Sequence, residues 1–326
     1  MSLPRFFALF SVVLFSLIGL IALFKEHPIT HPTNESPQAP LEIELDSQIQ
    51  IVTPAVAVAT TSTSVLPRKQ MIELPEANRI EELFIKDDSR LPFVETVTYK
   101  SHVPWLKGRP AWLSDYASHY ETSRHFIARS LNGQSDYFKQ EVAEGERFNV
   151  FRADKKLAFH LVVDTSRCKM WLYAVDEEAK KKMLLKTYTV GLGRIESAKT
   201  SGLLTPLGTY SLGNRIAIYK PKATGIHQGK KIEMITVFGT RWIPFEQEIG
   251  GCTAPAKGFG IHGTPWIRQG ESIVDNKASV GRYDSDGCIR LSTDDIEELF
   301  AIIITKPTTI EIVHDFADST VAMTKH

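Results

Sequence analysis

The chain has 326 residues, of which 43% are hydrophobic and 23% charged, so it can bury one large core or two smaller ones. It contains 38 lysines and arginines and 38 aspartates and glutamates, and this balance does not indicate a nucleic-acid-binding protein. Three cysteines in a chain of this length exclude a fold that depends on a disulfide framework.

The chain begins with an apolar segment. Residues 6–24 contain no charged side chain and are flanked by Arg5 and Lys25. A helix of this length spans about 28 Å, close to the ~30 Å hydrocarbon core of a bilayer. A cleaved signal peptide is the alternative, but its apolar region is usually ~7–15 residues long and ends in small residues. We predict a membrane anchor over residues 1–25, with the rest of the chain on the outer, periplasmic face of the cytoplasmic membrane.

Two segments separate this anchor from the largest part of the chain. Residues 26–94 are predicted to form a linker, because prolines and small polar residues interrupt them and no helical period is sustained. Residues 95–152 contain two helical stretches, at 112–120 and 124–133, and a strand after the turn at Gly145. This pattern predicts either a small α/β subdomain that resembles the LysM glycan-binding module or a helical subdomain that packs on the next domain.

The hydrophobic period changes to two from residue 157 onward. Residues 294–303 keep a helical period and begin with acidic side chains, which favour a helix N-terminus. We therefore predict a mainly β domain over residues 157–314 with one or two helices, followed by a C-terminal tail over residues 315–326. The predicted strands lie at residues 157–163, 169–173, 184–190, 208–212, 232–238 and 310–313.

Two motifs in this domain carry reactive side chains. The motif SDGCIRL places Cys288 directly after Gly287 and two residues before Arg290, and the motif GIHGT contains His262. The thiolate is the nucleophilic form of cysteine, and a nearby histidine can take the thiol proton and later return it. Backbone N–H groups at Gly287 and Cys288 can stabilise an oxyanion, and the guanidinium of Arg290 can hold a carboxylate or carbonyl. The motifs predict acyl transfer by Cys288 with His262 as general base.

The same residues also have purely structural interpretations. Cys288 is then a buried core thiol, His262 a hydrogen-bonded core histidine, and Arg290 an ion-pair partner. The three cysteines show no C-x-x-C spacing of zinc ligands, so we predict no metal and no other cofactor. Cys168 and Cys252 either pair in an oxidising compartment or stay reduced.

Four elements, in this order along the chain, resemble the L,D-transpeptidase catalytic domain, also called the YkuD domain. They are the strand pair at 162–165 and 170–173, the TPLGTY turn at 205–210, the histidine motif and the cysteine motif. Members of this family remodel bacterial peptidoglycan. The resemblance covers about half of the chain and implies an L,D-transpeptidase-like β-sandwich.

The resemblance also implies a reaction and its site. Cys288 attacks the bond after the diamino acid of a stem tetrapeptide, which releases D-alanine and forms a thioester. An amine of another stem peptide then gives a 3→3 cross-link, or a protein becomes attached to the stem. Carbapenems are expected to acylate the same thiol. His262 is the implied base, and Gly287, Ser285, Arg290 and Gly263 are the implied oxyanion or substrate contacts.

Two features depart from the family pattern. Asp286 stands where the family usually has histidine, and a carboxylate beside a thiolate raises the pKa of the thiol. The alternatives for Asp286 are an ion pair with a lysine or arginine, selection of a cationic substrate amine, or a solvated turn residue. The 25 residues between His262 and Cys288 form a long gap, in which we expect a loop at residues 268–278 near the cleft.

Two alternative functions remain open at this point. An L,D-carboxypeptidase or endopeptidase of the same fold lets water resolve the thioester. A non-catalytic peptidoglycan-binding protein keeps the fold but has lost the reaction through Asp286.

Overall fold

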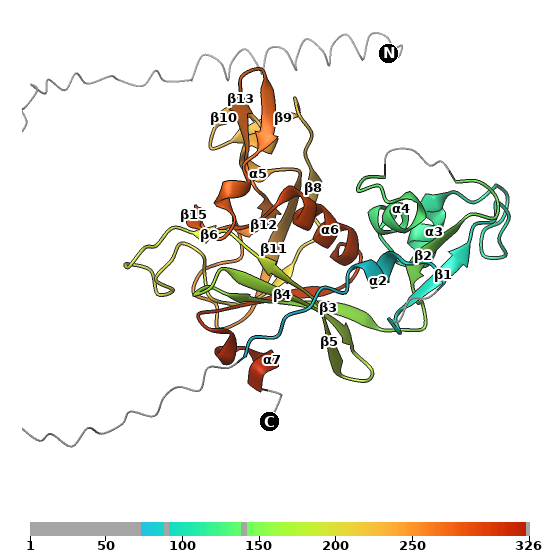
Figure 1. Ribbon diagram of the computed structural model, residues 1–326, viewed down its shortest axis with the longest axis horizontal. Helices are drawn as coiled ribbons and strands as arrows, with labels where there is room; N and C mark the ends of the chain where they lie inside the picture. The colour runs from blue at the N-terminus through green and yellow to red at the C-terminus, as the bar shows by residue number, and fades with distance from the viewer. Residues whose placement is uncertain (1–72, 88–90, 138–141, 324–326) are drawn as a thin grey trace, which may run out of the picture. The chain divides into compact units, whose positions relative to one another are not determined.

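The structure is a computed structural model that describes residues 73–87, 91–137 and 142–323 (Figure 1). The predicted anchor over residues 1–25 and most of the predicted linker lie outside these ranges. Within them, no helix is both long and apolar enough to cross a bilayer.

The last part of the predicted linker is packed onto the fold. Helix α2 (Glu81–Phe84) buries Leu83 completely, and Ile80 is 4% exposed. The indole Nε1 of Trp171 donates a hydrogen bond to the carbonyl of Pro75 at 2.7 Å. The folded part of the chain therefore begins well before residue 94, where the linker was expected to end.

A small α/β unit follows. Its elements are β1 (Val94–Thr98), α3 (Leu113–His119), α4 (Arg124–Asn132) and β2 (Arg147–Phe151). The two strands pair in antiparallel fashion, and both helices come between them in the sequence. The Ser123 side chain caps α4 by accepting a hydrogen bond from the His125 N–H, and Gly133 with φ of 77° ends the helix. Both helices and β2 lie where they were predicted, but β1 was not predicted. The unit is thus α/β rather than purely helical, and its likeness to LysM stays a prediction.

Nine strands form the sheet of the larger domain. Eight of them follow the order β16-β12-β11-β7-β17-β3-β4-β5, and β8 pairs with β11. Most neighbours are antiparallel, whereas β17 with β3 and β12 with β16 are parallel. The mainly β class is confirmed, with one curled sheet in place of two separate sheets (Figure 1). The strands are β3 (Leu157–Asp164), β4 (Lys169–Asp176), β5 (Lys181–Thr189), β7 (Gly208–Leu212), β8 (Ala217–Ile218), β11 (Arg241–Gly250), β12 (Gly260–Gly263), β16 (Ile289–Leu291) and β17 (Thr308–Val313).

Shorter strand pairs carry the connections between these strands. They are β6 (Leu192–Gly193) with β15 (Tyr283–Ser285), β9 (Thr224–His227) with β10 (Lys230–Glu233), and β13 (Trp266–Gln269) with β14 (Ser272–Asp275). The loop expected at residues 268–278 is thus mostly the β13–β14 hairpin, followed by the 3-10 turn η1 (Lys277–Ser279). The strand predicted at 232–238 is wrong in its second half, which forms the helical turn α5 (Ile235–Phe238). A short apolar run cannot distinguish a strand from a buried helical turn by its period alone.

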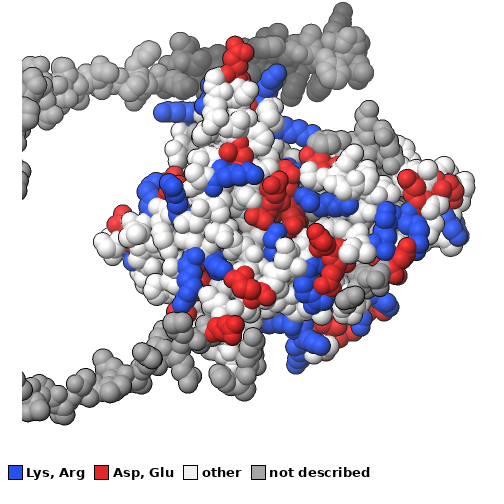
Figure 2. Space-filling view, in the orientation of Figure 1, with Lys and Arg blue, Asp and Glu red and all other residues white. Residues whose placement is uncertain are grey.

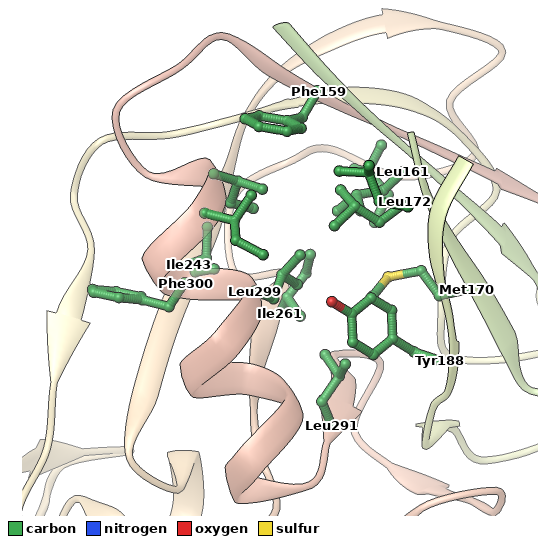
Figure 3. Close-up of a cluster of buried hydrophobic side chains, with 14 of the residues drawn as sticks. Phe159, Leu161, Met170, Leu172, Tyr188, Ile243, Ile261, Leu291, Leu299 and Phe300 are labelled. Carbon is green, nitrogen blue, oxygen red and sulfur yellow. The ribbon is translucent and has the colours of Figure 1, made fainter. Parts of the chain in front are cut away.

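Helix α6 (Thr293–Ile303) covers the inner face of the curled sheet and confirms the helix predicted at 294–303. Its first turn is capped by the Ser292 side chain, which accepts a hydrogen bond from the Asp295 N–H. Leu299 and Phe300 are fully buried with side chains from β3, β4, β11 and β12 (Figure 3). Each such side chain contributes about 1.5–3 kcal/mol through removal of apolar surface from water.

The predicted C-terminal tail is folded against the opposite face of the sheet. It forms the 3-10 turn η2 (Phe316–Asp318) and the helical turn α7 (Thr320–Met323). The ring of Phe316 lies 4.5 Å from that of Trp171, and Val321 is 5% exposed. The Thr320 N–H and hydroxyl donate to the Glu311 carboxylate at 2.9 and 2.8 Å. Residues 315–323 therefore belong to the packed domain.

A buried ion pair joins the α/β unit to the sheet. Arg241, the first residue of β11, is 1% exposed, and its guanidinium contacts the Asp136 carboxylate. Glu297 of α6 lies 3.5 Å from the same guanidinium. Removal of a carboxylate that pairs with a buried cation of this kind destabilises the folded state, because it leaves the charge uncompensated.

We expect Asp136→Asn to lower the free energy of unfolding by about 3 kcal/mol, because it leaves the buried Arg241 without its nearest carboxylate. Asp154→Asn is the matched control, since it breaks the exposed Arg152–Asp154 pair, and no measurable change is expected. Urea unfolding followed by tryptophan fluorescence compares the two variants. Equal stability of both variants would contradict the prediction.

Candidate active site

Strands β12 and β16 bring the predicted nucleophile and base to one face of the sheet. The strands pair in parallel with His262 opposite Arg290. The residue before each of these is a fully buried isoleucine, so the alternation of side chains places His262, Arg290 and Cys288 on the other face. Extending the register puts Cys288 beside Gly260, with its Cα about 8 Å from that of His262.

His262 is oriented by its own strand. It is 3% exposed, and its Nδ1 lies 2.7 Å from the carbonyl oxygen of Gly263. A carbonyl oxygen only accepts, so Nδ1–H is the donor and Nε2 keeps its lone pair. Burial lowers the pKa of His262 to about 4, although the Gly263 carbonyl favours the protonated ring. The ring is therefore neutral at pH 7, with Nε2 available as a base.

Two aromatic rings pack against this imidazole. Phe238 of α5 lies edge-on at 5.4 Å between ring centroids, and Trp242, the β11 partner of His262, lies at 5.9 Å. These rings exclude water from one side of the base and account for its low pKa.

Cys288 is a thiol at neutral pH. Burial raises its pKa to about 11, while the Gly260 backbone and the positive charge of Arg290 act in the opposite direction. Its Sγ donates a long hydrogen bond of 3.8 Å to the carbonyl of Gly258. Within the described residues no hydrogen bond joins the thiol to the His262 ring. The resting site is thus a neutral thiol and a neutral imidazole rather than an ion pair.

Ser285 and Thr205 hold the loop that carries the nucleophile. The Ser285 hydroxyl donates to the Cys288 carbonyl at 2.7 Å and accepts from the Gly287 N–H at 3.1 Å. The Thr205 hydroxyl donates to the Gly287 carbonyl at 3.0 Å and accepts from the Gly193 N–H at 2.7 Å. Ser285 and the Gly287 N–H are therefore engaged inside the loop. The Cys288 N–H makes no hydrogen bond to any residue that the structure describes and is free for an oxyanion.

Gly287 is required by both conformation and space. Its φ of 119° is rarely adopted by L side chains, and an added Cβ would lie 2.6 Å from the Phe259 ring and 2.8 Å from the Leu204 carbonyl oxygen. The glycine thus lets the Cys288 loop pack directly on residues 204–205 and 259.

Arg290 is held beside the reactive pair. Its Nη1 donates to Asp284 at 2.7 Å, and its main chain exchanges two hydrogen bonds of 2.8 Å with Gly191. The side chain is 16% exposed, and Nε is buried without a partner among the described residues. Arg290 is therefore an ion-pair partner whose charge also reaches Cys288 and His262.

Asp286 points to an arginine that the sequence did not single out. Its carboxylate lies 2.7 Å from the Arg194 guanidinium, and the two side chains are 73% and 56% exposed. Pairing with Arg194 offsets the negative charge, which is the smallest contribution to the pKa of Cys288. The turn at Thr205 was predicted from its sequence motif. No sequence motif predicted the roles of Arg194 and Phe238, because their contacts join distant parts of the chain.

Cys168 and Cys252 are both free thiols, so neither forms the disulfide left open by the sequence. Cys168 is buried, and Cys252 is partly exposed. In the part of the chain that the structure describes, no three histidine, cysteine or acidic side chains come together as a metal site.

Comparison with known proteins identifies one domain family. Residues 158–312 match the family model of the L,D-transpeptidase catalytic domain, YkuD. A search of curated proteins gave no match.

Several solved structures are similar to part of the chain, and the chain spans about half the length of the first two. Bd1075 of Bdellovibrio bacteriovorus is 16% identical, with a TM-score of 0.32 and coverage of 49% of each chain. The helical cell shape determining protein Pgp2 of Campylobacter jejuni is 18% identical, with a TM-score of 0.32 and coverage of 50% of this chain and 52% of that one. L,D-transpeptidase 1 of Mycobacterium tuberculosis is 17% identical, with a TM-score of 0.23 and coverage of 48% and 62%.

Gly287→Ala is expected to lower the rate of Cys288 acylation by about 100-fold, because the new Cβ displaces the loop that holds the thiol. Gly133→Ala is the control, since Gly133 also has a positive φ but no atom lies within 4 Å of its added Cβ. That variant should lose about 1 kcal/mol of stability and keep the rate. Stopped-flow acylation and thermal unfolding separate the two effects, and a normal rate in Gly287→Ala would contradict the packing argument.

The rate of Cys288 alkylation by iodoacetamide should rise about tenfold per pH unit above neutrality, since it follows the thiolate fraction. The plateau is expected only near the raised pKa of about 11. Arg290→Gln should slow alkylation at any pH below that plateau, because it removes a charge that lowers the pKa of the thiol. A plateau near pH 7 would instead indicate a thiolate–imidazolium pair.

Proposed function

We propose, from the membership of residues 158–312 in the L,D-transpeptidase catalytic domain family, that the protein forms 3→3 cross-links between peptidoglycan stem peptides. The observation that carries the proposal is the common face of β12 and β16. It presents the Cys288 thiol together with a histidine whose Nε2 is unprotonated.

The first step acylates the enzyme. As Sγ of Cys288 attacks the carbonyl carbon of the diamino acid, which is bonded to the nitrogen of D-alanine, its proton passes to Nε2 of His262. The oxyanion that forms is stabilised by the free N–H of Cys288. When the C–N bond breaks, His262 returns the proton to the departing amine of D-alanine, and a thioester remains.

The second step resolves the thioester. The side-chain amine of a second stem peptide attacks the thioester carbonyl and gives one proton to His262, and the Cys288 sulfur leaves and takes up that proton. If water attacks instead, the product is a tripeptide and the enzyme is an L,D-carboxypeptidase. The site is neutral before each step, so no buried ion pair has to be separated when substrate binds.

Arg290 and Asp286 have different proposed roles. The Arg290 guanidinium, fixed by Asp284, holds a substrate carboxylate or carbonyl next to the thiol. Asp286 does not disable the reaction, because Arg194 compensates its charge at the exposed rim. This argues against the alternative of a non-catalytic wall-binding protein.

The proposal includes a location. The uncharged residues 6–24 would anchor the chain in the cytoplasmic membrane, with the catalytic domain on the outer face, where peptidoglycan is found.

Intact-protein mass spectrometry of the full-length protein tests the function. We expect an adduct with a disaccharide tetrapeptide and with a carbapenem in the wild type and in Cys252→Ala, which lacks the other partly exposed thiol. The adduct should be absent in Cys288→Ala and at least about 100-fold slower to form in His262→Ala.

The muropeptide products decide between the acceptors. Dimers with a 3→3 cross-link support transpeptidation, whereas tripeptide alone shows that water is the acceptor. A wild-type protein with neither adduct nor product would overturn the enzymatic proposal.

A further inference from the structure

One surface segment beside the active site has charge of a single sign. Residues 215–231, here called the basic hairpin, run from before β8 into β10 and contain no aspartate or glutamate. Over most of the face shown in Figure 2, acidic and basic side chains are interspersed. The basic side chains of this segment are all exposed, and they are Arg215, Lys220, Lys222, Lys230 and Lys231.

The basic hairpin is packed against the ring that touches the catalytic base. In the antiparallel pair β9–β10, Lys230 lies opposite His227. The His227 ring meets the Phe238 ring edge-on at 5.3 Å, and Phe238 in turn lies 5.4 Å from His262. The hairpin is thus one aromatic ring away from the imidazole, within about one or two Debye lengths at physiological salt.

Three lysines of the basic hairpin have no ion-pair partner among the described residues. Lys222, Lys230 and Lys231 form no ion pair within the described residues, unlike Lys186 of β5, which pairs with two carboxylates of α6. The nearest acidic side chain along the chain, Glu233, accepts a hydrogen bond from the Lys222 backbone N–H. A cluster of uncompensated cations next to a reactive site raises the local concentration of anionic ligands and speeds their association.

We propose that the basic hairpin binds the free carboxylates of peptidoglycan stem peptides that neighbour the one being cleaved. The proposal rests on the proposed function, since it assumes that the substrate is a polymer with many such carboxylates. Each single contact is weak, but a polymer offers many carboxylates at once, so the summed attraction favours polymer over an isolated tetrapeptide. A lipid surface fits less well, because Ile226 is the only large apolar side chain of β9 and β10 that is mostly exposed.

Cosedimentation of the full-length Cys288→Ala protein with purified peptidoglycan tests the proposal without requiring turnover. The hairpin variant carries Lys222→Gln, Lys230→Gln and Lys231→Gln. We expect its Kd for peptidoglycan to rise about tenfold at low salt, and the difference to disappear at high salt as the charges are screened. The matched control replaces three other exposed lysines by glutamine, Lys180 before β5 and Lys181 and Lys182 at its start, and should bind as the parent does.

The ligand side has its own control. In this control the carboxylates of peptidoglycan are amidated with a carbodiimide. The parent protein should bind the amidated peptidoglycan as weakly as the hairpin variant binds untreated peptidoglycan. Unchanged binding of the hairpin variant, equal losses in both lysine variants, or full binding to amidated wall would each overturn the proposal. The proposal would also be overturned if the hairpin variant lost binding to phosphatidylglycerol vesicles but still bound peptidoglycan. That result would identify a membrane surface as the ligand of the hairpin. The cosedimentation assay uses the Cys288→Ala protein and does not depend on adduct formation. A failure of the catalytic proposal can therefore be distinguished from a failure of the binding proposal.

Discussion

The parallel pairing of β12 with β16 is the constraint on which the rest of the site depends. Ile261 and Ile289 of these strands are fully buried against the core under α6. A shift of either strand by one residue would move an isoleucine out of the core and a histidine or arginine into it. The hydrophobic core therefore fixes the register, and the register fixes which side chains meet on the outer face.

Desolvation is the second consequence of this arrangement. The same packing that positions His262 and Cys288 buries His262 and leaves Cys288 only partly exposed, and this desolvation favours the uncharged form of each at neutral pH. Hydrogen bonds to main-chain carbonyls then orient the imidazole and contact the thiol in place of water. Charge is present nearby, but it is carried by Arg290 and balanced by Asp284 at the edge of the site.

Much of the domain was predictable because its signals are local. Alternating apolar residues at 157–163 and 208–212, and the acidic start of the helix at 294–303, mark elements that the structure confirms. The contacts of Arg194 with Asp286 and of Phe238 with His262 were not predictable, because they join segments far apart in the sequence. The two misjudged ends of the domain have the same cause. Residues around Pro75 and Phe316 look like linker and tail by composition, and only their contacts with Trp171 in β4 make them part of the fold.

The way in which the N-terminal segment joins the sheet has a mechanical consequence. Residues 77–79 run along β5, where main-chain hydrogen bonds link Arg79 to Leu185 and Ala77 to Thr187. In the strand order, β5 lies at one edge of the sheet and β16 at the other. A pulling force that arrives through the preceding chain would therefore load β5 and β4 first. The strands that align thiol and imidazole lie at the far end of the strand order and would carry little of that load.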